Sequence, residues 1–389
     1  MTANTRVSLK LFGIAATAAA GAAFFLYTLK ANGAPVAASS ALKNPQTGGL
    51  KLQSASSLSF GPGGLLLVAE SGSASVVAIE TGDIGPLVKL KQRVDNVSGL
   101  IANGLGTTAE NLTINDMAVN PDSGRIYISA SRKPDNATSV ITVDAEGKAR
   151  QLDLTNLPWA RITLPGGTNS KVTRITDVAF AGDRVLAAGS CNEEFASKIF
   201  SLPVPLEHGG TASIYSAETY HVAHRKWETK APISSFIPYE ENGQSYVVGA
   251  FACTPIAKFP LNDLKPGSQV KGVSVMELGS GNRPLDLFSY NKGGKRWLVT
   301  HTQRFHKPLF GPSNLWAARV DMAYLSKSEP TATNENATRR DTKQKAGPDG
   351  VEIVDSLFGA VQVDKLSDEE AIVLRETAAG LALEVAALP

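Results

Sequence analysis

The chain has 389 residues, 43% of them apolar, and its 38 basic and 36 acidic residues give a formal net charge of +2. This apolar content is enough for a large core, in one big domain or in two ordinary ones. No basic stripe interleaved with aromatic residues occurs, which argues against a nucleic-acid partner.

The N-terminus differs in composition from the rest of the chain. Arg6 and Lys10 precede a 19-residue apolar run at 11–29, and Val36–Ala38 offers small residues at which a leader could be cleaved. The run is long for a signal peptide and just long enough to cross a bilayer as a helix. We therefore expect residues 1–38 to be a signal peptide or a helical membrane anchor, followed by a linker at 39–48. The remainder is then periplasmic or extracellular, and only this segment contacts a membrane.

One pattern of two short strands repeats along the body. In its clearest copy, the apolar strand Ile114–Val119 is followed by a polar turn and a second strand at 125–129. When the copies are aligned on the third residue of this first strand, successive units are 59, 61, 58 and 51 residues apart. The aligned residues are Ser57, Asp116, Asp177, Ser235 and Asp286. A β unit that recurs at a nearly fixed period predicts radial repetition.

The sequence therefore predicts an all-β fold, a single β-propeller at 49–389 with six blades of four antiparallel strands each. A seventh blade would follow if residues 91–113 contain a weak unit, and a β-sandwich or two small barrels are the alternatives. Residues 326–350 are polar and aperiodic, which indicates a mobile insertion. The last unit offers strands at 360–364, 371–375 and 380–386, and residues 49–53 are expected to complete it and close the ring.

On a propeller, four of the five histidines and both cysteines are expected on one face, over three neighbouring blades. These residues are His221, His224, His301, His306, Cys191 and Cys253. Imidazole and thiolate ligands suit copper or zinc, which makes a transition-metal site one hypothesis. In the alternative, the histidines are ordinary polar loop residues and the two cysteines form a disulfide, as a cysteine pair in an exported protein suggests. A histidine that acts as a catalytic acid or base is the third hypothesis.

A second candidate site lies on the inner strands. Asp116, Asp177 and Asp286 hold equivalent positions and should surround the mouth of the central channel, with Asp364 nearby. Calcium, which takes six to eight oxygen ligands, is a candidate cation for them, although less favoured than copper or zinc. In the alternative, these carboxylates accept backbone N–H groups and link neighbouring blades.

Three further residues are candidates for ligand binding. Arg283 lies on a connection between blades, where it could bind a carboxylate or phosphate or pair with Asp286. Glu193 follows Cys191 and adds acid to the same face, and Arg304 flanks the loop that contains His306.

The apolar leader, the repeated Asp-containing inner strands and the 50–60-residue period resemble bacterial periplasmic propellers. That class includes NHL-like and YVTN-like repeat proteins, quinoprotein dehydrogenase propellers and calcium-dependent lactonases. The resemblance covers about residues 50–389 and implies the architecture, not an active site. We predict an exported binding or accessory protein that presents a His/Cys/Asp-rich face to a small molecule, a metal ion or a partner protein. The alternatives are a metal-dependent hydrolase or oxidoreductase with its site at that face, and an interaction scaffold without a metal.

Overall fold

A computed structural model of the chain describes residues 41–133, 135–253, 255–308, 311–326, 333–341 and 343–389. The predicted signal or anchor segment lies outside these residues. Among the helices in the described ranges, none is long and apolar enough to span a bilayer.

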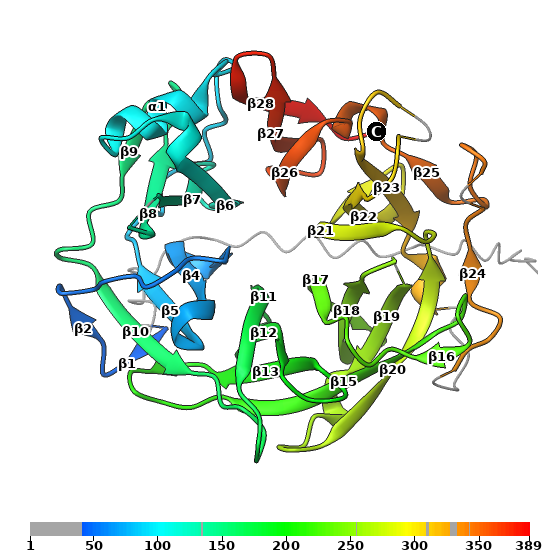
Figure 1. Ribbon diagram of the computed structural model, residues 1–389. Coiled ribbons are helices and arrows are strands. Elements are labelled where there is room, and N and C mark those ends of the chain that lie inside the picture. The colour runs from blue at the N-terminus through cyan, green and yellow to red at the C-terminus, as the bar shows by residue number, and fades with distance from the viewer. Residues whose placement is uncertain (1–40, 134, 254, 309–310, 327–332, 342) are drawn as a thin grey trace, which may run out of the picture. The chain divides into compact units, whose positions relative to one another are not determined.

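The described part is an all-β, propeller-like structure (Figure 1). The first sheet contains β2 (Gln46–Thr47), β10 (Pro158–Thr163), β5 (Ser75–Glu80), β4 (Leu65–Glu70) and β3 (Ser57–Gly61), in that order, and β1 (Leu42–Lys43) pairs with β14 (Leu206–Glu207) beside it. A second sheet contains β6 (Leu112–Val119), β7 (Ile126–Arg132), β8 (Ala137–Val143) and β9 (Ala149–Gln151).

The largest sheet has ten strands. Its main path is β11 (Val172–Phe180), β12 (Arg184–Cys191), β13 (Ser197–Pro203), β15 (Ser213–His221), β20 (Gln269–Glu277), β19 (Pro255–Pro260), β18 (Gln244–Phe251) and β17 (Ile233–Glu241). Off this path, β16 (Lys226–Trp227) pairs with β15, and β24 (Thr338–Arg339) pairs with β20. Part of the predicted polar insertion therefore forms a strand on the outer edge of β20.

Two further sheets complete the structure. One contains β21 (Asn282–Lys292), β22 (Lys295–Arg304), β23 (Leu315–Asp321) and β25 (Val351–Ile353), and the other contains β26 (Ala360–Lys365), β27 (Glu370–Thr377) and β28 (Gly380–Ala387). The helices among the described residues are α1 (Val97–Gly104) and α2 (Ala323–Ser326), with short 3-10 turns at Pro62–Gly64, Ser71–Ser73, Ala109–Asn111, Leu261–Asp263 and Asp355–Leu357. Residues 91–113, the site of a seventh blade in the alternative prediction, contain α1 and one of these turns.

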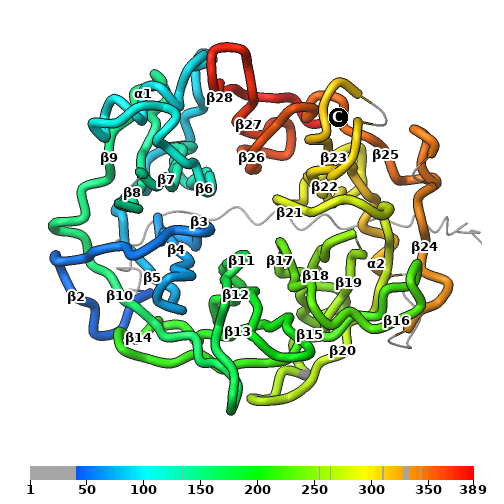
Figure 2. Tube along the Cα trace, viewed as in Figure 1, coloured from blue at the N-terminus to red at the C-terminus, as the bar shows by residue number. Residues whose placement is uncertain are grey.

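The innermost strands form a closed circle. In the order β3, β11, β17, β21, β26 and β6, each strand contacts the next, and β6 contacts β3 (Figure 2). Separate clusters of buried apolar residues fill the spaces between neighbouring sheets around this circle, and one further cluster lies between the β11 and β17 parts of the ten-stranded sheet. The cluster between the β3 and β11 sheets includes Leu67 and Phe200, and the one between the β21 and β26 sheets includes Val299 and Val373. This apolar burial is the main stabilising contribution that joins the sheets.

The order of the units around the circle differs from their order in the sequence. The β6 sheet lies between the β26 and β3 sheets, and β11 contacts β3 instead of β6. This arrangement follows from β10, which comes after the β6 sheet in the chain and returns to the first sheet, where it lies between β5 and β2 (Figure 2). The hydrogen-bonded sheets also do not repeat as six equal sets of four strands.

The predicted closure of the last unit is wrong. Residues 49–53 form no strand, and the short strand before them, β2, pairs with β10 in the first sheet. The edge of β28 is instead paired by Val94, whose N–H and C=O groups bond to the C=O and N–H groups of Leu383, each across 2.9 Å. The segment before α1 reaches this edge because the β6 sheet is the neighbour of the β26 sheet.

Candidate functional site

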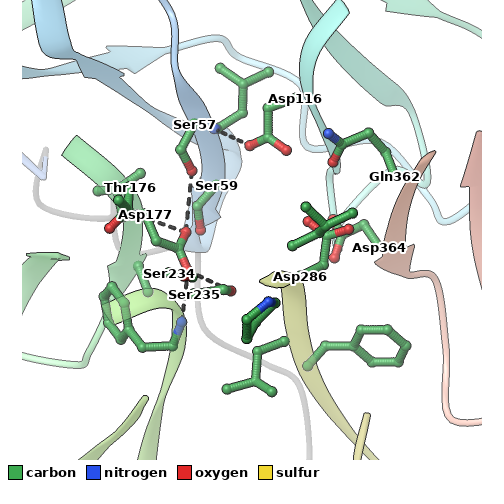
Figure 3. A pocket seen from close by; sticks show the side chains of 18 of the residues that line it. Ser57, Ser59, Asp116, Thr176, Asp177, Ser234, Ser235, Asp286, Gln362 and Asp364 are labelled. Atoms are coloured by element: carbon green, nitrogen blue, oxygen red, sulfur yellow. Dashed lines mark hydrogen bonds between the residues drawn. The ribbon is translucent and has the colours of Figure 1, made fainter. Parts of the chain in front are cut away.

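A central cavity of about 520 Å³ lies where the inner strands converge. Its wall includes Asp116, Asp177 and Asp286, which the sequence predicted to gather around a channel, together with Asp364 (Figure 3). Serine, threonine, asparagine and glutamine side chains add further polar groups to the wall. Rigid strands therefore supply a cavity rich in hydrogen-bonding groups, within the usual volume range of small-molecule sites.

A bulge positions the residue that faces the cavity on five of the inner strands. The pairing register shifts between Ile114 and Asp116 in β6, and it shifts at the equivalent place in β11, β17, β21 and β26. In β26 the shift lies just before Gln362, so Gln362 is the equivalent of Asp116 and Asp364 lies two residues farther along. Such bulges redirect a side chain locally. The aligned positions are thus Ser57, Asp116, Asp177, Ser235, Asp286 and Gln362.

The carboxylates at these positions link each strand to the next strand around the circle. Asp116 accepts the N–H of Leu58 across 2.7 Å, and Asp286 accepts the N–H of Val363 across 3.1 Å. Asp364 lies two residues beyond the aligned position of β26 and makes the same kind of link, since its carboxylate accepts the N–H of Val119 in β6 across 2.6 Å. These hydrogen bonds correspond to the alternative in which the aspartates join neighbouring blades.

Asp177 is the most completely bonded of the group. Its Oδ1 accepts the hydroxyl of Ser57 and the N–H of Val178, and its Oδ2 accepts the hydroxyl of Ser235 and the N–H of Phe236, at distances of 2.8–3.2 Å (Figure 3). The donors come from β3, β11 and β17, so this one carboxylate connects three inner strands.

The pKa values of three cavity carboxyls are raised. Burial raises the pKa of Asp364 to about 7 and, against four hydrogen bonds that lower it, raises the pKa of Asp177 to about 6. Burial, with the negative charges of Asp286 and Asp177 nearby, also holds the pKa of Asp116 well above its usual range. Near neutral pH such carboxyls can carry a proton, so they can donate as well as accept hydrogen bonds.

His301 is fully buried beside Asp286. Its Nε2 lies 2.9 Å from the carbonyl oxygen of Ala360, and its Nδ1 lies 2.9 Å from Oδ2 of Asp286. A carbonyl oxygen can only accept, so Nε2 carries a hydrogen, and the contact at Nδ1 requires one more proton between the ring and the carboxyl group. The pair therefore joins β21, β22 and β26 and holds a proton at the cavity wall.

The remaining candidate histidines do not line the central cavity. His221 and His224 stack at the end of β15, with ring centroids 4.1 Å apart, and Nε2 of His221 is 3.6 Å from Oε1 of Glu277. The ring of His306 lies against Gly281, since a Cβ there would be 2.9 Å from it. The connection containing His221 and His224 is on the outermost strand of its group, far along the sheet from the inner strand that faces the axis.

Within the described ranges, no group of three or more His, Cys, Asp or Glu side chains is arranged to hold a metal ion. The copper or zinc site and the calcium site suggested by the sequence thus find no set of ligands there.

No disulfide joins Cys191 and Cys253, which corrects that prediction. Cys191 is buried at the end of β12, where its N–H bonds to Ala196, and burial raises the pKa of its thiol. Cys253 has a φ of 63° and donates its N–H to the carbonyl of Asn282 in β21. The two strand ends are equivalent in the repeat, but each turn is bonded to different neighbours, so the matching positions do not bring the sulfur atoms together.

Of the three ligand-binding candidates, only Arg283 lines the central cavity. Glu193 forms an ion pair with Lys198 at 2.8 Å and lies with Cys191 in a second, more open hollow of about 480 Å³. Arg304 donates to the main-chain carbonyls of Lys307 and Ser280.

Arg174, which the sequence analysis did not single out, also lines the central cavity. A signal for it exists in the sequence, because Arg174–Asp177 and Arg283–Asp286 both have the spacing Arg-x-x-Asp in the same part of the repeat. Gln362 was missed as well, since only the bulge reveals that it is the counterpart of the aspartates.

Comparisons with known proteins give no family. No family model and no curated protein matches this sequence. Among solved structures, the chain is similar to an exo-1,5-α-L-arabinanase from a bovine ruminal metagenomic library, with 12% identity, a TM-score of 0.36 and coverage of 71% of this chain and 93% of that one. It is also similar to Trypanosoma rangeli sialidase in complex with sialic acid, with 10% identity, a TM-score of 0.32 and coverage of 85% and 53%.

A chain of a yeast heterotrimeric nucleoporin complex is similar to the same degree, with 9% identity, a TM-score of 0.36 and coverage of 88% of this chain and 99% of that one. At these identities and TM-scores, the similarities carry no argument about activity, substrate or partner.

Proposed function

We propose that the chain is a six-bladed β-propeller that binds a small polar molecule in its central cavity, as a binding or accessory protein. The blade number is supported by the closed circle of inner strands, each of which begins one antiparallel set. The proposed ligand site is the central cavity, whereas the sequence-based hypothesis placed it on a face formed by His and Cys residues.

The observation that carries this proposal is the polar wall of the cavity. Gln362 lines it, and the buried Oε1 of this residue accepts no hydrogen bond within the described residues. Buried polar atoms in folded proteins nearly always have a partner, so a donor from a bound molecule or water is expected there. The protonatable carboxyls of Asp116 and Asp364 supply further hydrogen bonds from fixed strand positions.

Ligand-observed NMR with monosaccharides, sugar acids, amino acids and small organic acids tests the proposal. Ser59 lines the cavity, and Ser59→Trp should fill it and abolish binding. Ala137→Trp, at an exposed residue that begins β8, is the matched control and should leave binding unchanged. Failure of the whole panel to bind, or equal binding by Ser59→Trp, would refute the proposal.

Hydrolysis is the second candidate function, and the raised pKa values of the cavity carboxyls favour it. A carboxyl with a pKa of about 7, such as Asp364, can donate a proton to a leaving group near neutral pH. Chromogenic glycosides and esters are suitable substrates for a first assay. Turnover that disappears in Asp364→Asn but persists in Asp122→Asn, which lies on a turn, would support an enzyme.

We also propose export, on the basis of the positively charged and apolar N-terminal sequence. Fractionation of cells that produce the full chain, with mass spectrometry of the mature N-terminus, distinguishes cleavage near 36–38 from retention as an anchor. Recovery of uncleaved protein in the cytoplasm alone would refute this part of the proposal.

A further inference from the structure

Two arginines line the central cavity from equivalent places in the repeat. Arg174 belongs to β11 and Arg283 to β21, and both side chains are exposed. Each precedes the aspartate at the aligned position of its strand by three residues. Both β11 and β21 contact β17, so the arginines approach the same end of the cavity from the two strands that flank β17.

The carboxylates that follow these arginines in sequence are already bonded to other groups. Asp177 accepts four hydrogen bonds, and Asp286 is bonded to His301 and to the N–H of Val363. In the described parts of the chain, neither arginine forms an ion pair. Arg283 donates from Nη2 to Oε1 of Gln303 across a long 3.4 Å. Two positive charges therefore face one end of the cavity without an acidic partner there.

We propose that Arg174 and Arg283 bind the carboxylate or phosphate group of a small hydroxylated molecule whose other polar groups extend to the aligned positions. This inference rests on the proposed function and names the ligand class for the same cavity. The planar guanidinium group presents several N–H donors in a fork that matches two oxygens of a carboxylate or phosphate. An anion at this end satisfies both arginines at once.

The separation along the strands between the arginines and the aligned positions indicates the length of the ligand. Three residues of β-strand span about 10 Å, which is comparable with the length of a sugar acid. At this distance from the arginines, Oε1 of Gln362 can accept a hydrogen bond from a hydroxyl group of the ligand, and the carboxyl group of Asp116 can donate or accept one. A molecule with an anionic end and a hydroxylated body therefore matches both parts of the wall.

Isothermal titration calorimetry with gluconate, glucose phosphate and glucose tests this inference, because the three probes share a carbon skeleton and differ in charge. Gluconate or glucose phosphate should bind about tenfold or more tightly than glucose, as expected for hydrogen bonds to a charged group. Which of the two binds more tightly distinguishes a carboxylate from a phosphate ligand. Added salt should weaken binding of the anionic probes and leave binding of glucose unchanged.

Arg174→Gln and Arg283→Gln should each weaken binding of the anionic probes by about tenfold, without changing binding of glucose. Arg150→Gln, at an exposed arginine on β9, is the matched control. The lysine variants at the two positions keep the charge but lose the fork, and they should retain part of the preference. Thermal melting confirms that each variant is folded.

Equal binding of glucose and the anionic probes, or undiminished anion binding by the double glutamine variant, would overturn the inference. If glucose binds and Ser59→Trp abolishes that binding, the proposed cavity function survives while the anionic ligand class fails. If neither these probes nor the wider panel binds, both proposals fail together.

Discussion

Asp286 and Glu277 are both carboxylates beside a histidine, but the two pairs differ in geometry. On the inner wall, Asp286 and His301 are 2.9 Å apart, and both ring nitrogens of His301 have a hydrogen-bonding partner. At the outer edge, Glu277 and His221 are 3.6 Å apart, and the buried Nδ1 of His221 makes no hydrogen bond within the described residues.

The consequence is a difference in protonation. Burial, with the nearby His224 as the next cause, lowers the pKa of His221 to about 4, so this ring is neutral at physiological pH. The inner pair, in contrast, needs a shared proton for its contacts. The comparison teaches that strand register and bulges bring donors to hydrogen-bonding distance on the inner wall, whereas at the ends of the outer strands β15 and β20 the same residue types are less well matched.

Removal of an inner-wall carboxylate should have the largest effect. Asp177→Ala leaves four donors without their acceptor, which should lower the free energy of unfolding by about 3–5 kcal/mol. Asp183→Ala, on an exposed turn of the same unit, is the control and should change stability by about 0.5 kcal/mol or less. Urea denaturation measures both, and equal effects would show that the inner position has no special role.

The two histidines should respond differently to the same substitution. His301→Leu removes the partner of both Asp286 and the Ala360 carbonyl, and should destabilise the protein by about 2–4 kcal/mol. His221→Leu removes no hydrogen bond shorter than 3.5 Å among the described contacts, and should cost about 1 kcal/mol or less. Thermal or urea unfolding that ranks the two variants in the opposite order would contradict the comparison.

The pH dependence of stability should reveal the half-buried inner carboxyl Asp364. Its pKa is raised from 3.8 to about 7 in the folded protein, so the folded state binds this proton more tightly than the unfolded state. Its contribution to stability is therefore complete below about pH 4 and is lost as the pH rises through about 7, with a slope of up to about 1.4 kcal/mol per pH unit. Unfolding of wild type and Asp364→Asn, measured from pH 4 to 8, should show a flatter profile for the variant. Parallel profiles would count against this assignment.

The smallest effect is expected from reducing agents. Because no disulfide joins Cys191 and Cys253, the melting temperature should be the same with and without a reductant. Labelling of the denatured, unreduced protein should find two thiols. In the folded protein Cys191, which is 2% exposed and has a raised pKa, should react more slowly than the half-buried Cys253. Detection of a disulfide in the purified protein would contradict the structure.

The repeat in the sequence predicts the all-β, propeller-like fold and the convergence of Asp116, Asp177 and Asp286, because period and strand alternation are local properties. It does not predict the circular order of the first two units. That order depends on the pairing of β10 with β5, and the whole β6 sheet lies between these two strands in the chain. The predicted disulfide failed for a similar reason. Equivalent positions in the repeat place residues at equivalent strand ends, but the turns there have different bonding partners, as Cys191 and Cys253 show.

What the sequence analysis missed about the cavity wall and its surroundings depends on features of strand pairing. Gln362 takes the aligned position because the bulge in β26 lies after Ala360, which no local pattern indicates. His301 appeared to be a loop residue, yet it lies within β22 and faces β26. Arg174 was within reach of sequence analysis, because its spacing to Asp177 repeats that of Arg283 to Asp286.

The return of β10 to the first sheet has a consequence for the nascent chain. β5 stays without its outer partner until residues 158–163 have left the ribosome, and by then the whole β6 sheet has been synthesised. That sheet in turn waits for its neighbour β26, which is among the last segments to emerge. The first sheet therefore cannot be completed before the second has been synthesised, and a truncated product would expose apolar sheet faces for chaperones or proteases to recognise.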